Sequence, residues 1–193
     1  MKNLSIGLII FIFISCGRPV YENPHVIIRT GYGDIELELY PKKAPATVNA
    51  FLSCIDSGLY TESSFYRVLK AEELPTDHNT GIIQGGIWKR APQKTGTSKT
   101  IRHESTQLTG LSHIDGTISM ARQDTGTART EFFICIGDQS SLDFGRRGSA
   151  DGQGYAAFGR VFKGMDIVRK IQGRESNGDA FTKDIPIQGI TRF

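Results

Sequence analysis

Side chains that could do chemistry are sparse in this sequence, and the familiar catalytic constellations are incomplete. His103-Glu104 lacks the second histidine of a His-Glu-x-x-His metal site, and His113 lies across a glycine-containing loop. A hydrolase built on His113 and Asp115 would call for a serine on a Gly-x-Ser-x-Gly turn, which is missing. The glycine-rich segment from Gly145 to Gly154 lacks the Lys-Ser/Thr pair and the following helix of a phosphate loop. We therefore predict neither a metal nor a cofactor.

Four other segments place isolated polar side chains next to aromatic, apolar or glycine residues. They are Phe65-Tyr66-Arg67-Val68, Gln84-Gly85-Gly86, the stretch from Ser119 to Cys135, and Ala157-Phe158-Gly159-Arg160-Val161. Their joint order resembles the cyclophilin family of peptidyl-prolyl isomerases, and the resemblance runs from Val26 to Arg192. It implies a mainly β protein: a closed eight-stranded antiparallel cyclophilin-like β-barrel capped by two α-helices.

The resemblance also implies a reaction, peptidyl-prolyl cis–trans isomerisation. Amide resonance puts a barrier of about 18–20 kcal/mol on rotation of a peptide bond, and an isomerase must favour the twisted amide. Arg67 matches the family's catalytic arginine, which donates to the prolyl nitrogen or the adjoining carbonyl, and Gln84 matches the glutamine that orients it. Without the surrounding match, Arg67 would be read as a surface ion pair at a strand end.

By the same resemblance, Phe133 forms the floor of an apolar slot for the proline ring, and Ala121 lies beside the preceding substrate residue. Phe132 then points into the barrel, because neighbouring residues of a strand face opposite sides. The full set of expected substrate-binding residues is Ile82, Ala121, Arg122, Glu131, Phe133, Leu142 and Tyr155.

Several positions depart from the family pattern. Gly81 stands where a pocket phenylalanine is usual, so one wall of the slot is absent or supplied from elsewhere. Tyr155 replaces a histidine, and Ser141 replaces a tryptophan that contributes to cyclosporin binding, so we expect cyclosporin to bind poorly. The segment from Leu69 to Thr80 contains additional polar residues, and we expect it to line or overhang the groove. Glu131 stands in place of a glutamine, and Arg122 in place of an asparagine.

Hydrophobic patterning indicates many short strands and two helices. Residues 26–29 predict a strand, and the alternation of apolar and polar residues over 35–40 predicts its hairpin partner. Val48, Phe51, Leu52 and Ile55 have helical spacing after Pro45, and a second helix is expected from about Met165 to Gln172. Short apolar runs separated by glycines lie between them, at 81–88, 116–121, 131–136 and 155–162. This pattern favours an antiparallel barrel.

Composition sets weaker limits. The sequence has 38% hydrophobic residues, 22 glycines and a formal net charge of +3 among 193 residues. This charge is too small to indicate a nucleic-acid partner, so none is expected. Cys54 and Cys135 lie among apolar neighbours and are expected to be buried free thiols, although spacing alone leaves a disulfide open.

The N-terminal segment has the pattern of an export signal. Residues 1–3 are cationic, residues 4–14 form an apolar run of eleven residues, and Ser15-Cys16-Gly17 follows. A small residue before cysteine is typical of a bacterial lipoprotein site, with Cys16 becoming the acylated first residue; the alternative is an ordinary secretory signal. The predicted organisation is a lipoprotein signal peptide over 1–15, a tether over 16–24 and an isomerase domain over 25–193.

Two functional hypotheses follow. In the first, a peptidyl-prolyl cis–trans isomerase, anchored to a membrane through Cys16 in the bacterial cell envelope outside the cytoplasm, accelerates folding of exported proteins. Its partners are proline-containing segments of those proteins, and the chain is expected to be a monomer. In the second, motivated by Gly81, a cyclophilin-like barrel binds proline peptides or acts as a chaperone module with little turnover.

Overall fold

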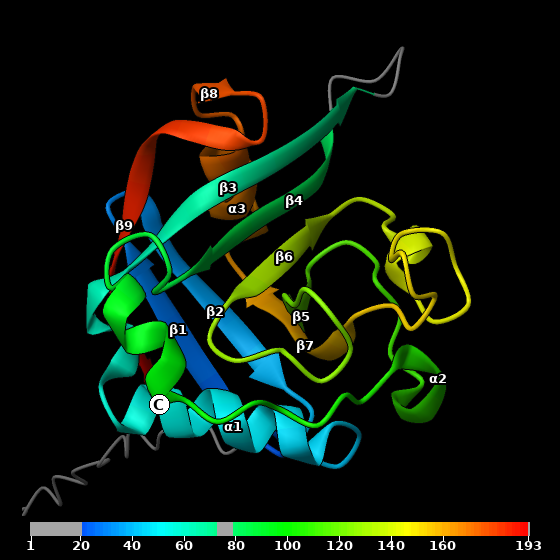
Figure 1. Ribbon diagram of the computed structural model, residues 1–193. Helices are drawn as coiled ribbons and strands as arrows, with labels where there is room; N and C mark the ends of the chain where they lie inside the picture. The colour runs from blue at the N-terminus through cyan, green and yellow to red at the C-terminus, as the bar shows by residue number, and fades with distance from the viewer. Residues whose placement is uncertain (1–20, 73–78, 193) are drawn as a thin grey trace, which may run out of the picture.

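The computed structural model describes residues 21–72 and 79–192 as a closed antiparallel barrel (Figure 1). Strands follow the order β1-β2-β7-β5-β6-β4-β3-β9, and β1 pairs with β9 to close the ring of eight. The two-residue strand β8 adds to β9 as a short hairpin. The strand bounds are β1 His25–Thr30, β2 Gly33–Leu39, β3 Ser63–Glu72, β4 Asn79–Gly86, β5 Thr117–Met120, β6 Phe132–Ile136, β7 Ala156–Lys163, β8 Ser176–Asn177 and β9 Ala180–Arg192.

Two main helices pack against the barrel, as the sequence predicts. Helix α1 (Pro45–Asp56) begins with proline and buries Val48, Phe51 and Leu52, and α3 (Met165–Gln172) buries Val168 and Ile171. Figure 1 shows α1 along the lower end of the barrel and α3 near the upper end, behind β3. The structure adds a four-residue helix α2 (Thr106–Thr109) and three short 3-10 helices: η1 Leu59–Glu62, η2 Pro92–Thr97 and η3 Ser140–Leu142.

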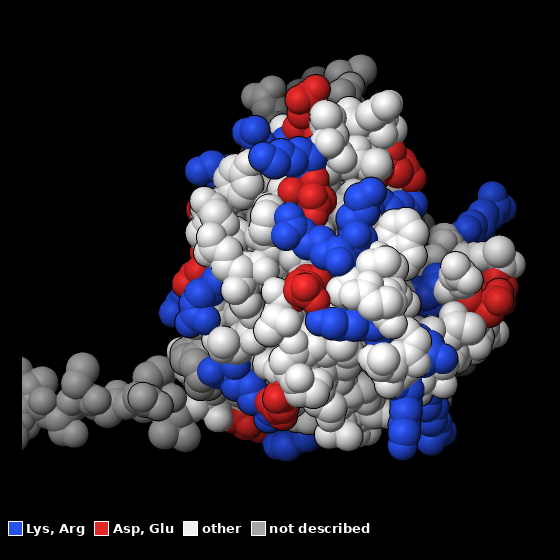
Figure 2. All heavy atoms as spheres, turned by 60° about the vertical axis from the view of Figure 1, so that its left-hand side comes forward, with Lys and Arg blue, Asp and Glu red and all other residues white. Residues whose placement is uncertain are grey.

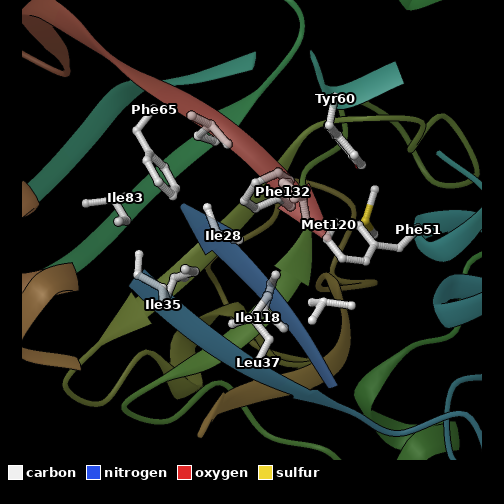
Figure 3. Close-up of a cluster of buried hydrophobic side chains, with 14 of the residues drawn as sticks. Ile28, Ile35, Leu37, Phe51, Tyr60, Phe65, Ile83, Ile118, Met120 and Phe132 are labelled. Carbon is white, nitrogen blue, oxygen red and sulfur yellow. The ribbon is translucent and has the colours of Figure 1, made fainter. Parts of the chain in front are cut away.

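Aromatic packing organises the core. Phe132 of β6 is fully buried, with ring centroids 5.7 Å from Phe51 of α1, 5.8 Å from Tyr60 and 6.0 Å from Phe65 of β3. All three contacts are edge-on, the geometry that aromatic quadrupoles favour. Figure 3 shows Phe132 among these rings and the β-branched residue Ile28. Phe132 therefore points into the barrel as expected, leaving the other face of β6 to Phe133.

A β-bulge in β3 breaks the alternation of its side chains. Phe65 pairs with Gly85 of β4, but the next pair is Arg67 with Gln84, so Tyr66 is the additional residue. A bulge bends its strand and redirects side chains, and bulges are common beside active sites. Tyr66 and Arg67 are adjacent in sequence, yet both line the same cavity.

The β3–β4 hairpin carries the additional residues noted in the sequence. Its ladder continues through Glu72 and Asn79, and the intervening residues 73–78 lie outside the described part of the chain. Gly81 has a φ of +135°, and a Cβ there would lie 2.1 Å from the carbonyl oxygen of Leu69. No side chain fits at position 81 without moving the β3 backbone.

Glu104 is used in the fold rather than in a metal site. Its carboxylate accepts hydrogen bonds from the amides of Ala46 (3.1 Å) and Thr47 (2.9 Å) and from the Thr47 hydroxyl (2.7 Å). These amides belong to the first turn of α1, whose preceding residue Ala44 has no side chain that could cap them. Within residues 21–72 and 79–192 no cluster of three or more metal-ligating side chains occurs.

Cys54 and Cys135 are buried and free, as expected. Burial raises the pKa of both thiols. On the face drawn in Figure 2, acidic and basic side chains are interspersed, without a large field of one sign.

Candidate active site

A cavity of about 800 Å³ opens along β3, β4 and β6. All nine residues that the sequence predicts for catalysis and substrate binding line it: Arg67, Ile82, Gln84, Ala121, Arg122, Glu131, Phe133, Leu142 and Tyr155. They come from six separate segments of the chain. Cys16, the tenth predicted residue, lies outside the described residues.

The apolar part of the cavity is built around Phe133. Ile82, Phe133 and Cys135 form a small cluster separate from the barrel core, and Leu69, Ala121, Leu142 and Tyr155 pack against it. The Tyr155 ring meets the Phe133 ring edge-on, with 5.4 Å between centroids. Leu69 is the residue from β3 that supplies a wall where Gly81 cannot. Of the two alternatives that Gly81 left open, an absent wall or a wall supplied from elsewhere, the packing of Leu69 favours the second.

A buried polar group supports this floor from below. The His113 ring stacks on Phe133 with 5.8 Å between centroids, and its Nδ1 lies 2.6 Å from Asp143 Oδ1. Its Nε2 lies 2.9 Å from Ser119 Oγ. Because a carboxylate only accepts, Nδ1 carries the proton and Nε2 accepts from the Ser119 hydroxyl. Burial lowers the pKa of His113, which favours this neutral form.

This arrangement has the residue types of a Ser-His-Asp triad, but Ser119 and His113 are each 0% exposed. A nucleophile must reach its substrate, so the group holds the floor in place instead. The partner of His113 is Asp143, whereas Asp115, considered from sequence spacing, pairs with Arg169 on α3 at 2.8 Å.

Arg67 lies at the polar end of the cavity with its guanidinium held on two sides. One NH group donates to Gln84 Oε1 at 3.1 Å, and the other donates to Asp179 Oδ2 at 3.0 Å. The Arg67 side chain is 40% exposed and faces the cavity. Within the described part of the chain these bonds use two of the five guanidinium N–H donors, which leaves donors for a bound peptide.

Glu131 is the residue before β6, and its carboxylate lies against the end of β4. Its Oε1 accepts from the amides of Ile87 (3.0 Å) and Trp88 (3.1 Å), and its Oε2 accepts from the Tyr66 hydroxyl at 2.6 Å. A Cβ at Gly86 would lie 2.4 Å from this carboxylate, so glycine is what allows the close approach. Burial raises the pKa of Glu131, and these hydrogen bonds act in the opposite direction.

Arg122 is more constrained than a free substrate-binding cation. It makes a bidentate pair with Asp151 (both 2.8 Å), donates to the Gly154 carbonyl, and lies over the Tyr155 ring at 5.1 Å. Arg122 thereby holds the pKa of Asp151 well below its usual range. It ties the loop before β7 to the cavity wall next to Ala121.

Sequence reasoning missed part of the cavity. Tyr66 was hidden by strand alternation, and Asp179, which pairs with Arg67, follows β8 far along the chain. Trp88 is the single tryptophan and is 56% exposed at the rim, with its ring 5.5 Å from Tyr66. Leu69 begins the segment that was expected to line or overhang the groove, and it lines the cavity. The further lining residues that were not predicted are Tyr66, Trp88, Thr95, Thr100, Gln123, Thr127, Arg129, Thr130, Gln139 and Gly148.

Comparison with known proteins gives a family match over nearly all of the described residues. Residues 25–192 match the family model described as "Cyclophilin type peptidyl-prolyl cis-trans isomerase/CLD". The chain therefore belongs to the cyclophilin-type peptidyl-prolyl cis–trans isomerase family, and it is an enzyme of that class.

Relatives and solved structures extend the match over most of the chain. Peptidyl-prolyl cis-trans isomerase B of Escherichia coli is 33% identical over 86% of this chain and 94% of its own. Isomerase A of Dickeya dadantii is also 33% identical, over 86% and 80%. A Cryptosporidium parvum cyclophilin-type isomerase structure has a TM-score of 0.69 at 24% identity, covering 89% of this chain and 98% of that one.

Proposed function

We propose that Arg67 and Gln84 carry the isomerase reaction, with the proline ring of the substrate in the slot of Ile82, Phe133 and Leu142. The residue before proline then lies beside Ala121. The observation that supports this assignment is the hydrogen bond between Arg67 and Gln84 in the same cavity as the apolar cluster around Phe133.

Rotation of the X–Pro bond breaks amide conjugation. The prolyl nitrogen regains a lone pair, and that lone pair is a hydrogen-bond acceptor only in the twisted state. A guanidinium donor aimed at this nitrogen stabilises the twisted amide more than either planar isomer, and so it lowers the barrier. The apolar slot holds the ring while the preceding carbonyl turns. No nucleophile and no proton transfer are required.

The isomerase assay on a proline tetrapeptide tests the assignment. Arg67→Ala is expected to lower kcat/KM by about a hundredfold, the scale of losing one preorganised transition-state donor. Arg160→Ala is the matched control, because Arg160 also projects from a strand and pairs with a carboxylate, Glu38, outside the cavity. If the Arg67→Ala variant keeps the wild-type kcat/KM, Arg67 has no catalytic role. Peptide binding without turnover by the wild type would favour the proline-binding module instead.

We also propose that the domain is a lipoprotein of the bacterial cell envelope, anchored through Cys16 and acting as a monomer on proline-containing segments of exported proteins. The support is the apolar run over 4–14 followed by Ser15-Cys16, and a first strand that begins at His25, shortly after the cysteine. Among the described residues, none of the helices is long and apolar enough to cross a membrane. In this proposal the attachment is made by acyl chains on residue 16.

Labelled fatty acid supplied to expressing bacteria tests the anchor. Incorporation into the wild type and its loss in Cys16→Ser are expected, with the variant shifting from the membrane to the soluble envelope fraction. Incorporation that survives Cys16→Ser would contradict lipidation at this residue. Light scattering of residues 24–193 tests the monomer, which a mass of two chains would contradict.

A further inference from the structure

Arg67 is the end of a continuous hydrogen-bonded chain that begins at a partly buried carboxylate. Glu131 Oε2 accepts from the Tyr66 hydroxyl at 2.6 Å, and the Tyr66 oxygen accepts from Gln84 Nε2 at 2.9 Å. Gln84 Oε1 then accepts from Arg67 at 3.1 Å. Two of the four residues lie in β3, one lies in β4 and one directly precedes β6. The hydrogen-bonded chain therefore crosses the polar wall of the cavity.

The direction of these hydrogen bonds is fixed by the carboxylate. Oxygens of an ionised Glu131 only accept, so the Tyr66 hydroxyl gives its one proton to Glu131 and has only lone pairs left for Gln84. Gln84 must therefore turn its NH2 group to Tyr66 and its oxygen to Arg67. The opposite amide orientation would place NH2 against the guanidinium, donor against donor. The carboxylate thus selects the orientation of Gln84 that can hold Arg67.

The Glu131 end of the chain is held firmly. Oε1 accepts from two backbone amides, those of Ile87 and Trp88, and from the Thr130 hydroxyl at 3.0 Å. Four donors therefore converge on this carboxylate, which suits its ionised form. The glycine at position 86 makes room for it, since any Cβ there would overlap the carboxylate. A carboxylate that already accepts from four protein donors has little acceptor capacity left for a substrate contact.

We propose that Tyr66 and Glu131 are positioning residues for the isomerase reaction, which orient Gln84 and through it the Arg67 guanidinium. This inference rests on the proposed role of Arg67. It assigns Glu131 to alignment of the catalytic donor instead of direct contact with the peptide. It also gives a function to the β3 bulge, which places Tyr66 on the same side as Arg67.

Tyr66→Phe is the first test, made in the full-length protein in mild detergent. The variant keeps the ring beside Trp88 and removes only the hydroxyl, so Gln84 is free to turn over. We expect kcat to fall about tenfold while the affinity for a proline peptide stays within about twofold. The single tryptophan, Trp88, lies at the cavity rim and reports that affinity by fluorescence. Equal loss of affinity and turnover, or no loss at all, would overturn the proposal.

Glu131→Gln is the second test, because it can reverse the donor and acceptor direction of the hydrogen-bonded chain with little change in side-chain shape. If the new amide keeps its oxygen toward Ile87 and Trp88, its NH2 faces Tyr66 and the Tyr66 proton turns to Gln84. Gln84 then presents NH2 to Arg67, and kcat falls as in Tyr66→Phe. The double variant should be no slower than the slower single variant. Losses that multiply would show independent roles and contradict a single chain.

A second Tyr–Glu pair in the same barrel gives matched controls. Tyr40 donates to Glu38 Oε2 at 3.1 Å at the end of β2, and neither residue lines the cavity. Tyr40→Phe and Glu38→Gln are expected to keep kcat within about twofold of the wild type. Thermal unfolding of each variant separates folding from alignment, and Tyr66→Phe carries the test if Glu131→Gln does not fold.

Failure of this inference differs from failure of the proposed function. If Arg67→Ala keeps wild-type turnover, the catalytic assignment itself is wrong. If Arg67→Ala loses turnover while Tyr66→Phe and Glu131→Gln keep it, only the positioning role is wrong.

Discussion

At the scale of single residues, Arg67 is distinguished by how many groups hold it. Gln84 and Asp179 accept from different nitrogens of the guanidinium, so its plane is fixed while part of it remains free for a substrate. A planar fork with several donors can satisfy both partners and still reach a third acceptor. Lysine has a single cationic nitrogen and no planar fork, so it cannot hold both partners and still reach a third acceptor.

Arg67→Lys is therefore expected to behave as a severe change despite keeping the charge. The ammonium can contact Gln84 or Asp179, but it cannot hold both and aim a donor at the prolyl nitrogen. We expect kcat to fall by about tenfold to a hundredfold with little change in peptide affinity, measured by the isomerase assay and by Trp88 fluorescence. Turnover near that of the wild type would mean that charge alone, without the fork, is sufficient.

Asp179 offers a separate prediction, because its pair with Arg67 is partly solvated. Its side chain is 62% exposed, and exposed ion pairs contribute little to stability and are screened by salt. Asp179→Asn is expected to leave the melting temperature within about 2 °C and to lower kcat about threefold. A strongly lowered melting temperature would instead indicate that Asp179 serves the β8–β9 hairpin. Asp184→Asn, which removes the carboxylate paired with Arg90, is the control.

Residue types and motif order predicted most of the candidate site, and the reasons for the omissions are physical. Arg67, Gln84 and Phe133 stand in short segments whose order along the chain carries the family pattern. Tyr66 is adjacent to Arg67, but strict alternation assigns it to the other face, and only the bulge returns it to the cavity. A bulge leaves no local signal in the sequence, because its position depends on the register of the partner strand.

At the scale of elements, the two long helices and most strands follow from hydrophobic spacing, glycine and proline. The first turn of α1 is different, since its stabilising group comes from far along the chain. Ala44 precedes the helix and cannot cap it, and Glu104 accepts from the amides of Ala46 and Thr47 instead. These partners lie 58 and 57 residues away in sequence. Because the partners of Glu104 are so distant in sequence, the local pattern around His103-Glu104 gives no sign of this capping role.

Glu104→Ala is expected to destabilise the fold without changing turnover. The variant leaves two helix amides and the Thr47 hydroxyl without their acceptor and removes a negative charge from the positive end of the helix dipole. The expected loss is about 1–2 kcal/mol in the free energy of unfolding, measured with urea. Glu62→Ala, which removes an exposed carboxylate paired with Lys94, should cost less than about 0.5 kcal/mol. Equal effects of the two variants would refute the capping role.

At the scale of the whole molecule, closure of the barrel is the feature that sequence patterning predicts least directly. Val26 near the beginning of the domain pairs with Arg192 near its end, and this contact joins β1 to β9. Short strands and glycine turns indicate an antiparallel barrel, but the order in which eight strands meet depends on pairings between distant segments. Closure leaves the cavity on the outer face of β3, β4 and β6, with His113 buried beneath it and paired with Asp143.

This buried histidine makes the stability of the domain depend on pH in a defined direction. Burial lowers the pKa of His113 below the 6.5 of an unfolded chain. At pH values between these two pKa values the unfolded state binds more protons than the folded state, so the free energy of unfolding rises with pH. The contribution of His113 to stability is therefore lost progressively as pH falls below about 6.5. For one proton the slope is at most about 1.4 kcal/mol per pH unit.

His113→Gln separates this contribution from those of other groups. The amide NH2 can donate to Asp143 and its oxygen can accept from Ser119, as the neutral imidazole does, but it takes up no proton. Urea unfolding at pH 7.5 and pH 5.5 should show a larger fall in the free energy of unfolding for the wild type than for the variant. Glu131, whose raised pKa acts with the opposite sign, is common to both proteins and cancels in the comparison. An equal fall in both would mean that His113 is protonated within the folded barrel as readily as in the unfolded chain.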